Sequence, residues 1–397
     1  MSGYGSSFSI RRVRLRHFKS IASCDVRLGP LAMLVGPNGS GKSNFLDALR
    51  LTSDALTTTL DHALRDRGGI TEVRRRSTGH PTHFRIELDF VQGLLAGSFS
   101  FQVAAVSGGD YRISHEDCMI QSAEFGHTER HHYSTRNGKL ASTSIREFPS
   151  VVDDRLSLVA ISAVEPFRTL FDGLSALAMY SLNPDSMRKL QNPDSGEQLR
   201  RDGSNAASVI ERLRRENPEL KARIEEYLGQ VVPGVDGVER ISLGSWESLE
   251  FRQHVTGAKQ PWSFAANSMS DGTLRALGVL LALFPAPSPV VSSVGIEEPE
   301  IALHPAAAGV LMGALRDASG NRQVLVTSHS PDLLDDPTIR EDELLAVRSE
   351  AGETVIGRPD SAGRLAIADG LFTAGEMLRQ DQLIPDKTRF ELPLPTT

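Results

Sequence analysis

Apolar and polar residues alternate along the first part of the chain with the two-residue period of β-strands. The alternation covers residues 8–35 and predicts two strands, the second of which ends in the apolar run LAMLV. Residues 44–51 are compatible with a helix, and a short glycine-rich segment separates them from the strands. We therefore predict the order strand, loop and helix near this end of the chain.

The middle of the chain changes from strand-like to helical patterning. Alternation between residues 84 and 120, followed by a hairpin turn at Asn137 and Gly138, predicts an antiparallel meander. Residues 150–230 place apolar side chains at helical spacing, and Pro218 starts or kinks one of these helices. No sustained heptad occurs, which excludes a long coiled-coil arm.

Two apolar strands near the other end of the chain each run into polar residues. The first strand ends in Glu297, Glu298 and Glu300, and the second, after an intervening helix, ends at His329. Parallel sheets place functional residues at the carboxyl ends of their strands. We therefore expect His329 to lie beside the acidic residues.

The glycine-rich segment between Gly36 and Ser43 matches the phosphate-binding loop G-x-x-x-x-G-K-[ST]. Glycines at positions 36, 39 and 41 allow backbone N–H groups to turn inward around a phosphate, and the following helix N-terminus favours the same anion. Lys42 would reach the β- and γ-phosphates of a nucleotide, and the Ser43 hydroxyl would bind Mg²⁺. The predicted nucleotide-binding residues of the loop are Gly36, Pro37, Asn38, Gly39, Ser40, Gly41, Lys42, Ser43 and Asn44.

Carboxylates at the end of a buried strand suit Mg²⁺-dependent phosphoryl chemistry. Glu297 fits the role of a metal-associated ligand, and Glu298 fits the role of the base that takes a proton from the attacking water. His329 is the candidate sensor of the γ-phosphate. The alternatives are an exposed turn for the sequence EEPE and a structural role for the histidine.

Composition describes a globular chain and restricts its partners. The 397 residues, 40% hydrophobic and 23% charged, suffice for one large α/β domain with insertions or for two to three smaller ones. With a net charge of −7, any contact with nucleic acid requires a local basic patch. Two arginine-rich runs are candidates for phosphate contacts or for plain surface solvation: Arg11, Arg12, Arg14 and Arg16, and Arg74, Arg75 and Arg76.

Cysteine usage and apolar runs point to the cytoplasm. Cys24 and Cys118 lie far apart without metal-like spacing, which indicates reduced thiols. The apolar run at 276–284 is too short to span a bilayer, and the N-terminal residues lack a signal core, so we expect no membrane association. The histidines, cysteine and acids between residues 115 and 132 match no standard metal-ligand spacing.

Four segments in this order resemble the ATPase heads of the SMC/RecF class of ABC-type proteins. They are LRHFKSIASCDVRLGPLAMLVGPNGSGKSNFLDAL, MSDGTLRALGVLLAL, GIEEPEIALHP and VTSHSPDLL. Within that class the chain resembles the compact AAA-family ATPases related to the overcoming-lysogenization-defect (OLD) nucleases, also in LRRDGSNAASVIERL. The resemblance implies a homodimer that sandwiches two ATP molecules. Each ATP would contact one subunit's phosphate loop and the signature turn at Ser270 and Gly272 of the other.

The sequence departs from the pattern of this class at two positions. Glu297 stands where the metal-associated strand usually ends in aspartate, and the signature reads SDGT where transporters have a double glycine. Taken alone, SDGT is a plain helix cap, because Ser268 or Ser270 can cap a helix that begins near Thr273. No residue is assigned to the glutamine loop.

We expect an α/β fold, a P-loop NTPase of the ABC-ATPase head type with an antiparallel β subdomain and a helical insertion. Residues 1–150 would form the N-terminal ATPase lobe, 151–235 the helical insertion, and 236–397 the C-terminal lobe with the signature, the acidic strand and the switch histidine.

The expected function is Mg²⁺-dependent ATP hydrolysis that drives dimerisation, on nucleic acid or towards a partner, in DNA repair or anti-phage defence. The alternative is a nucleotide-gated sensor or scaffold with negligible turnover. A small-molecule kinase is disfavoured, because no acceptor pocket is recognisable. The residues after His329 hold no strand-borne acidic pair for two metals, so a separate effector such as a nuclease is expected.

Overall fold

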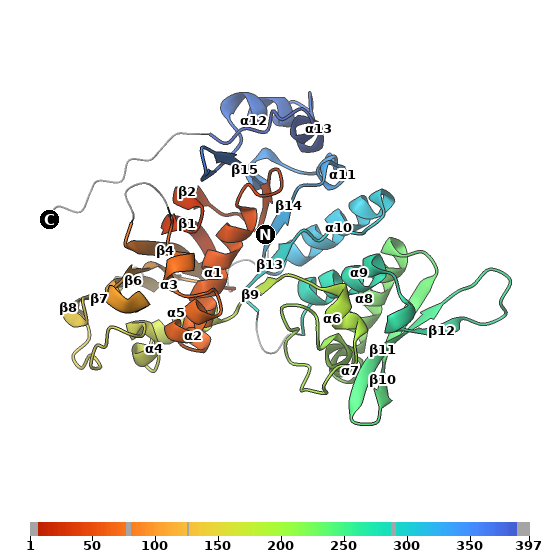
Figure 1. Ribbon diagram of the computed structural model, residues 1–397, viewed down its shortest axis with the longest axis horizontal. Helices are drawn as coiled ribbons and strands as arrows, with labels where there is room; N and C mark the ends of the chain where they lie inside the picture. Colours follow the sequence, from red (N-terminus) through yellow and green to blue (C-terminus); the bar gives the residue numbers. More distant parts are fainter. Residues whose placement is uncertain (1–6, 77–80, 125–126, 287–290, 387–397) are drawn as a thin grey trace. The chain divides into compact units, whose positions relative to one another are not determined.

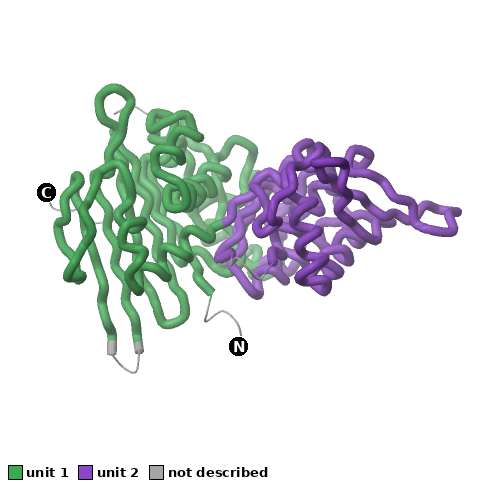
Figure 2. Tube along the Cα trace, turned by 90° about the horizontal axis from the view of Figure 1, so that it is seen from below, with its two compact units in different colours: residues 1–177, 340–372, 377–397 green, residues 178–339, 373–376 purple. Residues whose placement is uncertain are grey.

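The computed structural model describes residues 7–76, 81–124, 127–286 and 291–386 (Figure 1). By contact the chain divides into two compact units (Figure 2). Unit 1 contains residues 1–177, 340–372 and 377–397, and unit 2 contains residues 178–339 and 373–376. Among the described residues, no helix has the length and apolar character needed to cross a membrane.

Unit 1 contains a seven-stranded antiparallel sheet with the order β2-β1-β4-β5-β6-β7-β8. Apolar residues point alternately into its core, as in β4, where Phe84, Ile86, Leu88 and Phe90 are buried. This sheet is the antiparallel meander that the alternation predicted, with β1 and β2 added at one edge. Its strands are β1 Ser9–Phe18, β2 Ile21–Arg27, β4 His83–Gln92, β5 Leu95–Ala105, β6 Tyr111–Glu124, β7 His127–Arg136 and β8 Lys139–Thr143.

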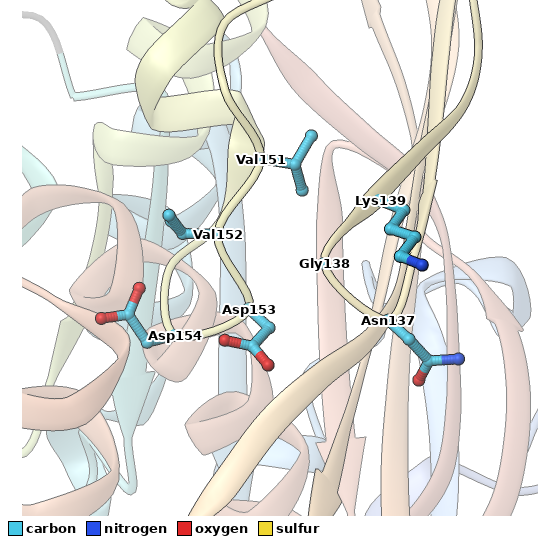
Figure 3. A pocket seen from close by; sticks show the side chains of 7 residues that line it. All are labelled: Asn137, Gly138, Lys139, Val151, Val152, Asp153 and Asp154. Carbon is cyan, nitrogen blue, oxygen red and sulfur yellow. The ribbon is translucent and has the colours of Figure 1, made fainter.

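The hairpin between β7 and β8 turns at Asn137 and Gly138, as the sequence predicts. Both residues have positive φ, 48° and 72°, which is the conformation of a two-residue hairpin turn. Beside this turn lies an open hollow of about 470 Å³, lined also by Lys139 and residues 151–154 (Figure 3). None of its lining residues belongs to a predicted site.

A second group of strands in unit 1 leads to the phosphate loop. β3 is buried along its whole length, β15 runs parallel to it, and β16 pairs antiparallel with β15. These strands are β3 Leu31–Val35, β15 Leu344–Glu350 and β16 Glu353–Gly357. The helices of unit 1 are α1 Lys42–Thr57, α2 Leu60–Arg65, α3 Ile70–Val73, α4 Ser157–Ile161, α5 Phe167–Ser175 and α12 Ser361–Ala368, with the 3₁₀ turns Ser107–Gly109 and Glu341–Glu343.

A fully buried carboxylate joins the antiparallel sheet to α4. Glu116 on β6 accepts hydrogen bonds from the Tyr133 hydroxyl at 2.7 Å and from the N–H groups of Ser157 and Leu158 at 2.6 and 2.9 Å. Three donors satisfy the buried carboxyl group, although burial raises its pKa. Glu116 therefore has a structural role.

Unit 2 contains a strand group in the order β14-β13-β9 and a separate sheet in the order β10-β11-β12. β13 and β14 are parallel and place Glu297 opposite Thr327. The strands are β9 Leu177–Tyr180, β10 Val235–Leu243, β11 Trp246–Gln253, β12 Trp262–Ala265, β13 Ser293–Glu297 and β14 Gln323–Ser328. The helices are α6 Pro184–Arg188, α7 Ala206–Glu216, α8 Pro218–Val231, α9 Asp271–Leu283, α10 Ala308–Ser319 and α11 Pro331–Leu334, with the 3₁₀ turns Ala266–Ser268 and Pro305–Ala307; α13 Ala374–Arg379 crosses the boundary between the units.

Candidate functional site

The phosphate loop of unit 1 connects the buried strand β3 to α1. Gly36 must be glycine, because an added Cβ would lie 2.0 Å from the carbonyl oxygen of Val347 on β15. Gly41 precedes α1 with a φ of +102°, and its Cβ would lie 2.0 Å from the Thr354 hydroxyl on β16. Two glycines of the motif are thus required by the strands that pack against the loop.

Lys42 holds the loop in a curled shape. Its side chain is only 4% exposed, and its amine donates hydrogen bonds to the carbonyl oxygens of Gly36 at 2.8 Å and Pro37 at 3.0 Å. The first N–H groups of α1 have no acceptor within the helix, and Ser43 in its first turn is exposed. The loop therefore combines backbone donors, a positive helix end and a lysine, which together favour an anion.

The donor groups of the loop fit a nucleotide phosphate. The buried hydroxyl oxygen of Ser40 has no hydrogen-bond partner, while Asn38 and Gly39 are exposed at the tip. A phosphate in the loop would provide an acceptor for such orphaned donors. The Ser43 side chain is exposed, so its hydroxyl oxygen is accessible to a Mg²⁺ ion as a ligand.

A chain of side-chain hydrogen bonds holds the phosphate loop in place. These contacts were not predicted from the sequence. The Thr354 hydroxyl on β16 donates to the Ser40 carbonyl at 2.8 Å and lies 2.7 Å from the Ser20 hydroxyl, which accepts from the Asn44 amide at 2.6 Å. Arg75 donates to the Ser20 carbonyl at 2.6 Å. We call Ser20, Asn44, Arg75 and Thr354 the loop brace.

The acidic residues of unit 2 lie at the carboxyl ends of β13 and β14, as the parallel-strand argument predicts. The N–H of Glu298 donates to the carbonyl of Thr327 at 3.0 Å, and Glu298 has a positive φ of 46°. A carboxylate oxygen of Glu298 lies 3.1 Å from Nδ1 of His329. Both side chains are partly exposed, so the pair is accessible to a water or a phosphate oxygen.

Glu300 forms the buried side of this cluster. Its carboxylate accepts hydrogen bonds from the Ser328 hydroxyl at 2.6 Å and from the N–H of His329 at 3.3 Å. Burial raises the pKa of Glu300, although both hydrogen bonds oppose this shift. Glu300 therefore holds the backbone that carries His329. This role was not predictable from the position of Glu300 in the acidic run.

Two arginines lie near the carboxylates. Nη2 of Arg201 lies 3.5 Å from a carboxylate oxygen of Glu297. Arg275, on α9, donates to the carbonyl of Leu182 at 3.3 Å. Burial lowers the pKa of Arg275, whereas Glu298 and the neighbouring acids raise it. Neither arginine was predicted from the sequence as part of this site, because both are distant from the acidic run along the chain.

The signature turn has the expected helix-capping geometry. Ser270 is the N-cap of α9, and its hydroxyl oxygen accepts the N–H of Thr273 at 3.1 Å. Of the two serines considered from the sequence, Ser270 is therefore the cap. An added Cβ on Gly272 would lie 2.3 Å from the carbonyl oxygen of Ala302, so the helix start packs closely against the loop after the acidic strand.

The predicted site residues thus fall into two sets, one in each unit. Unit 1 brings together the phosphate-loop residues Gly36 to Asn44. Unit 2 brings together Glu297, Glu298 and His329 at its strand ends. The signature turn belongs to unit 2 as well, where Gly272 packs against the loop that follows the acidic strand.

Several arginines of the two basic runs are paired with carboxylates. On β1 Arg12 pairs with Asp25, and Arg14 pairs with Glu87 and Asp89. In the second run Arg75 pairs with Glu353 at 2.9 Å, and Arg76 pairs with Glu72. These pairs reduce the positive charge that either run could present to nucleic-acid phosphates.

No metal-binding group forms around the histidines of the meander among the residues that the structure describes. The acid at position 117 instead pairs with Arg136 at 2.8 Å, and Cys118 is buried. His127 lies outside the side chains that are described.

The fold is that of the SMC-type ATPase heads, an ABC-type P-loop architecture. The chain is similar to the crystal structure of an SMC head bound to the C-winged helix domain of ScpA, with a TM-score of 0.54 and 12% identity over 89% of this chain and 99% of the other. It is also similar to an SMC head domain with an extended coiled coil from Pyrococcus furiosus, bound to the C-terminal domain of ScpA. There the TM-score is 0.51 and the identity 11%, over 92% and 99% of the two chains.

The sequence also matches a protein family directly. Residues 31–102 and 133–335 match the model of the family described as "AAA domain, putative AbiEii toxin, Type IV TA system". Because the matched segments make up more than half of the chain, the protein belongs to this AAA family. No curated protein matches the chain. The predicted fold class is thereby confirmed.

Proposed function

We propose that this protein binds ATP with Mg²⁺ and hydrolyses it. The observation that carries the proposal is the phosphate loop, in which Lys42 and the start of α1 converge on a curled, glycine-bounded backbone. The candidate ligands for Mg²⁺ are Ser43, at the start of α1, and Glu297, at the end of β13. When bound, the ion would neutralise phosphate charge and so favour attack on the γ-phosphate.

The acidic cluster supplies the groups that hydrolysis requires. Glu298 takes the proton of the attacking water, and His329, 3.1 Å from its carboxylate, orients Glu298 and contacts the γ-phosphate. Glu300 holds the backbone of His329 in place through its hydrogen bond to the N–H. The SMC-head fold supports this assignment, because it belongs to a class of ATPases.

We further propose that ATP drives two copies of the chain together and that the dimer acts on a separate partner. Ser270 and Gly272 at the start of α9 present backbone donors and a hydroxyl group, which suit the γ-phosphate held by a second copy. The description of the matching family, "putative AbiEii toxin, Type IV TA system", names a toxin, and the similar SMC head is bound to ScpA. Both facts support a partner protein more directly than a nucleic-acid surface.

Calorimetric titration of ATP into wild-type protein and into Lys42→Ala tests the nucleotide site. Removing the amine deletes charge-assisted phosphate contacts, so affinity should fall by about 100-fold or more. Lys189→Ala, which removes an exposed lysine of unit 2, should bind like wild type. Undiminished ATP affinity in a folded Lys42→Ala variant would remove the basis for the phosphate-loop assignment.

A further inference from the structure

The sheet β10-β11-β12 of unit 2 is covered by helices on one face. α7 and α8 pack against β10, and α7 also packs against β11 (Figure 1). On this inner face Leu249 and Phe251 of β11 are fully buried. Successive side chains of a strand point to opposite faces of its sheet. Trp246, Ser248 and Glu250 therefore lie on the other face, which we call the outer face.

The outer face carries apolar side chains near the hairpin between β10 and β11, where an uncovered sheet face usually carries polar ones. Leu243 lies opposite Trp246 across the two strands, and these side chains are 48% and 43% exposed. In the next row Ile241, which is partly exposed, lies opposite Ser248. Two adjacent rows of the outer face are therefore largely apolar.

A segment before α7 widens this apolar area beyond β11. Gln191 and Glu247 exchange backbone hydrogen bonds as an antiparallel bridge, which aligns Leu190 with Ser248 on the outer face. Leu190 is 51% exposed, whereas Ser248 between Leu190 and Ile241 is 5% exposed. The apolar side chains thus form one continuous surface, which we call the apolar patch: Leu190, Ile241, Leu243 and Trp246.

The next row of the outer face carries negative charge. Glu239 on β10 lies directly opposite Glu250 on β11, an arrangement that is unfavourable for like charges. Lys221 on α8 pairs with Glu239 at 3.1 Å, whereas none of the described residues forms an ion pair with Glu250. A cation from outside the chain would therefore be stabilised beside the apolar patch.

The spacing of these rows matches that of side chains along a helix. Residues of one strand face repeat about every 6.6 Å, and helical residues four apart rise by about 6 Å. We propose that the apolar patch binds an amphipathic helix of another polypeptide, with apolar residues at i, i+3 and i+4 and a lysine or arginine at i+7 or i+8 that pairs with Glu250. A second copy meeting this face with its own outer face would bring two Glu250 carboxylates into the contact without a cation. The inference goes beyond the proposed function, because it does not depend on ATP binding.

Photo-crosslinking in cells that make this protein tests the assignment. The full chain carries p-benzoylphenylalanine in place of Leu243, and mass spectrometry identifies the residues that it joins. We expect a segment of a different polypeptide with the stated apolar and basic positions. The same photoreactive residue in place of Trp262 is the control. Trp262 is 55% exposed but lies opposite Gln253, on the inner face, and should not join that segment.

Binding of a synthetic peptide of the cross-linked segment to purified protein measures the two parts of the surface. Trp246→Ser should weaken binding by about 30-fold or more, as expected for an aromatic residue at the centre of an interface. Leu190→Ser, in a separate segment, should weaken it by about 10-fold, which guards against a folding defect confined to β11. Glu250→Gln should weaken it by up to about fivefold, and less at high salt. Trp262→Ser should bind the peptide like wild type.

A cross-link to a second copy of this chain, no cross-link above that of the unmodified protein, or a joined segment without the basic residue would each overturn the assignment. Equal peptide affinities of wild type, Trp246→Ser and Leu190→Ser would overturn it as well. Wild-type protein that binds the peptide but no ATP would refute the proposed function and leave the assignment of the apolar patch standing.

Discussion

The protonation of a single side chain of the acidic cluster, Glu300, affects the stability of the fold. Burial raises its pKa above the ordinary value of 4.5, so the folded protein favours the protonated carboxyl group. The stability that Glu300 contributes is therefore complete below pH 4.5 and is lost as pH rises through the raised pKa of the folded state. Above the raised pKa the ionised, buried carboxylate opposes folding.

We predict that Glu300→Gln raises the melting temperature at pH 7.5 and that this gain shrinks towards pH 5. Glutamine stays neutral and still offers an oxygen to the hydroxyl of Ser328. Thermal unfolding at several pH values measures the effect. Glu72→Gln is the control: Glu72 pairs with Arg76 at the surface, so the melting-temperature change of this variant should depend little on pH. A lower melting temperature for Glu300→Gln at pH 7.5 would mean that the ionised form is stabilised by the fold.

Residue roles differ in how far the sequence can predict them. Lys42, Ser43 and the glycines could be assigned because the whole loop motif is contiguous. Ser270 could be named only as one of two caps, and Thr354 could not be found, since it reaches the phosphate loop from a position 314 residues away from Ser40. Contacts of this kind depend on strand pairing, which a single sequence does not specify.

At the scale of elements, β16 braces the phosphate loop through Thr354. Replacing Thr354 with valine keeps the shape but removes the hydroxyl that donates to the Ser40 carbonyl. We predict that nucleotide affinity, measured by calorimetry, falls by about 3- to 10-fold, which is the loss expected for one hydrogen bond. Thr57→Val on α1, whose hydroxyl bonds only its own helix carbonyl of Ser53, should bind normally. Equal affinities in the two variants would show that the brace does not position the loop.

The element predictions succeeded where turn chemistry is explicit. Asn137 and Gly138 marked a hairpin, and Pro218 marked the start of α8, which the structure confirms. The region 8–35 holds three strands and not the predicted two, because the second predicted strand is divided into β2 and β3 at residues 28–30, where Gly29 and Pro30 interrupt it. The four-residue strand β9 was missed, because a short apolar run has no period.

For the whole molecule, we predict that two copies of the chain associate when ATP binds. Glu298→Gln should retain ATP and form a dimer, which light scattering would detect as a doubled mass. Adding Ser270→Arg should prevent the dimer, because a long side chain at the start of α9 would crowd the proposed contact with the second copy. Ser361→Arg, at the exposed start of α12, is the control that should still dimerise. A Glu298→Gln protein that stays monomeric in saturating ATP would rule out the sandwich.

The overall architecture was predictable because the segments that carry it occur in a fixed order along the chain. The family match and the SMC-head similarity confirm that architecture. The resemblance to OLD-related ATPases, the dimer and the separate effector stay predictions. They concern surfaces and partners, which hydrophobic patterning does not determine.

The most direct test of the central claim is phosphate release from ATP by purified wild-type protein and by Glu298→Gln. We expect Mg²⁺-dependent turnover by wild type, and a rate about 10²- to 10⁴-fold lower in the variant, the usual effect of losing a general base. ATP affinity should be similar in both proteins, which separates binding from chemistry. Wild-type protein that binds ATP with Mg²⁺ without measurable turnover, or a Glu298→Gln variant with full turnover, would contradict the account.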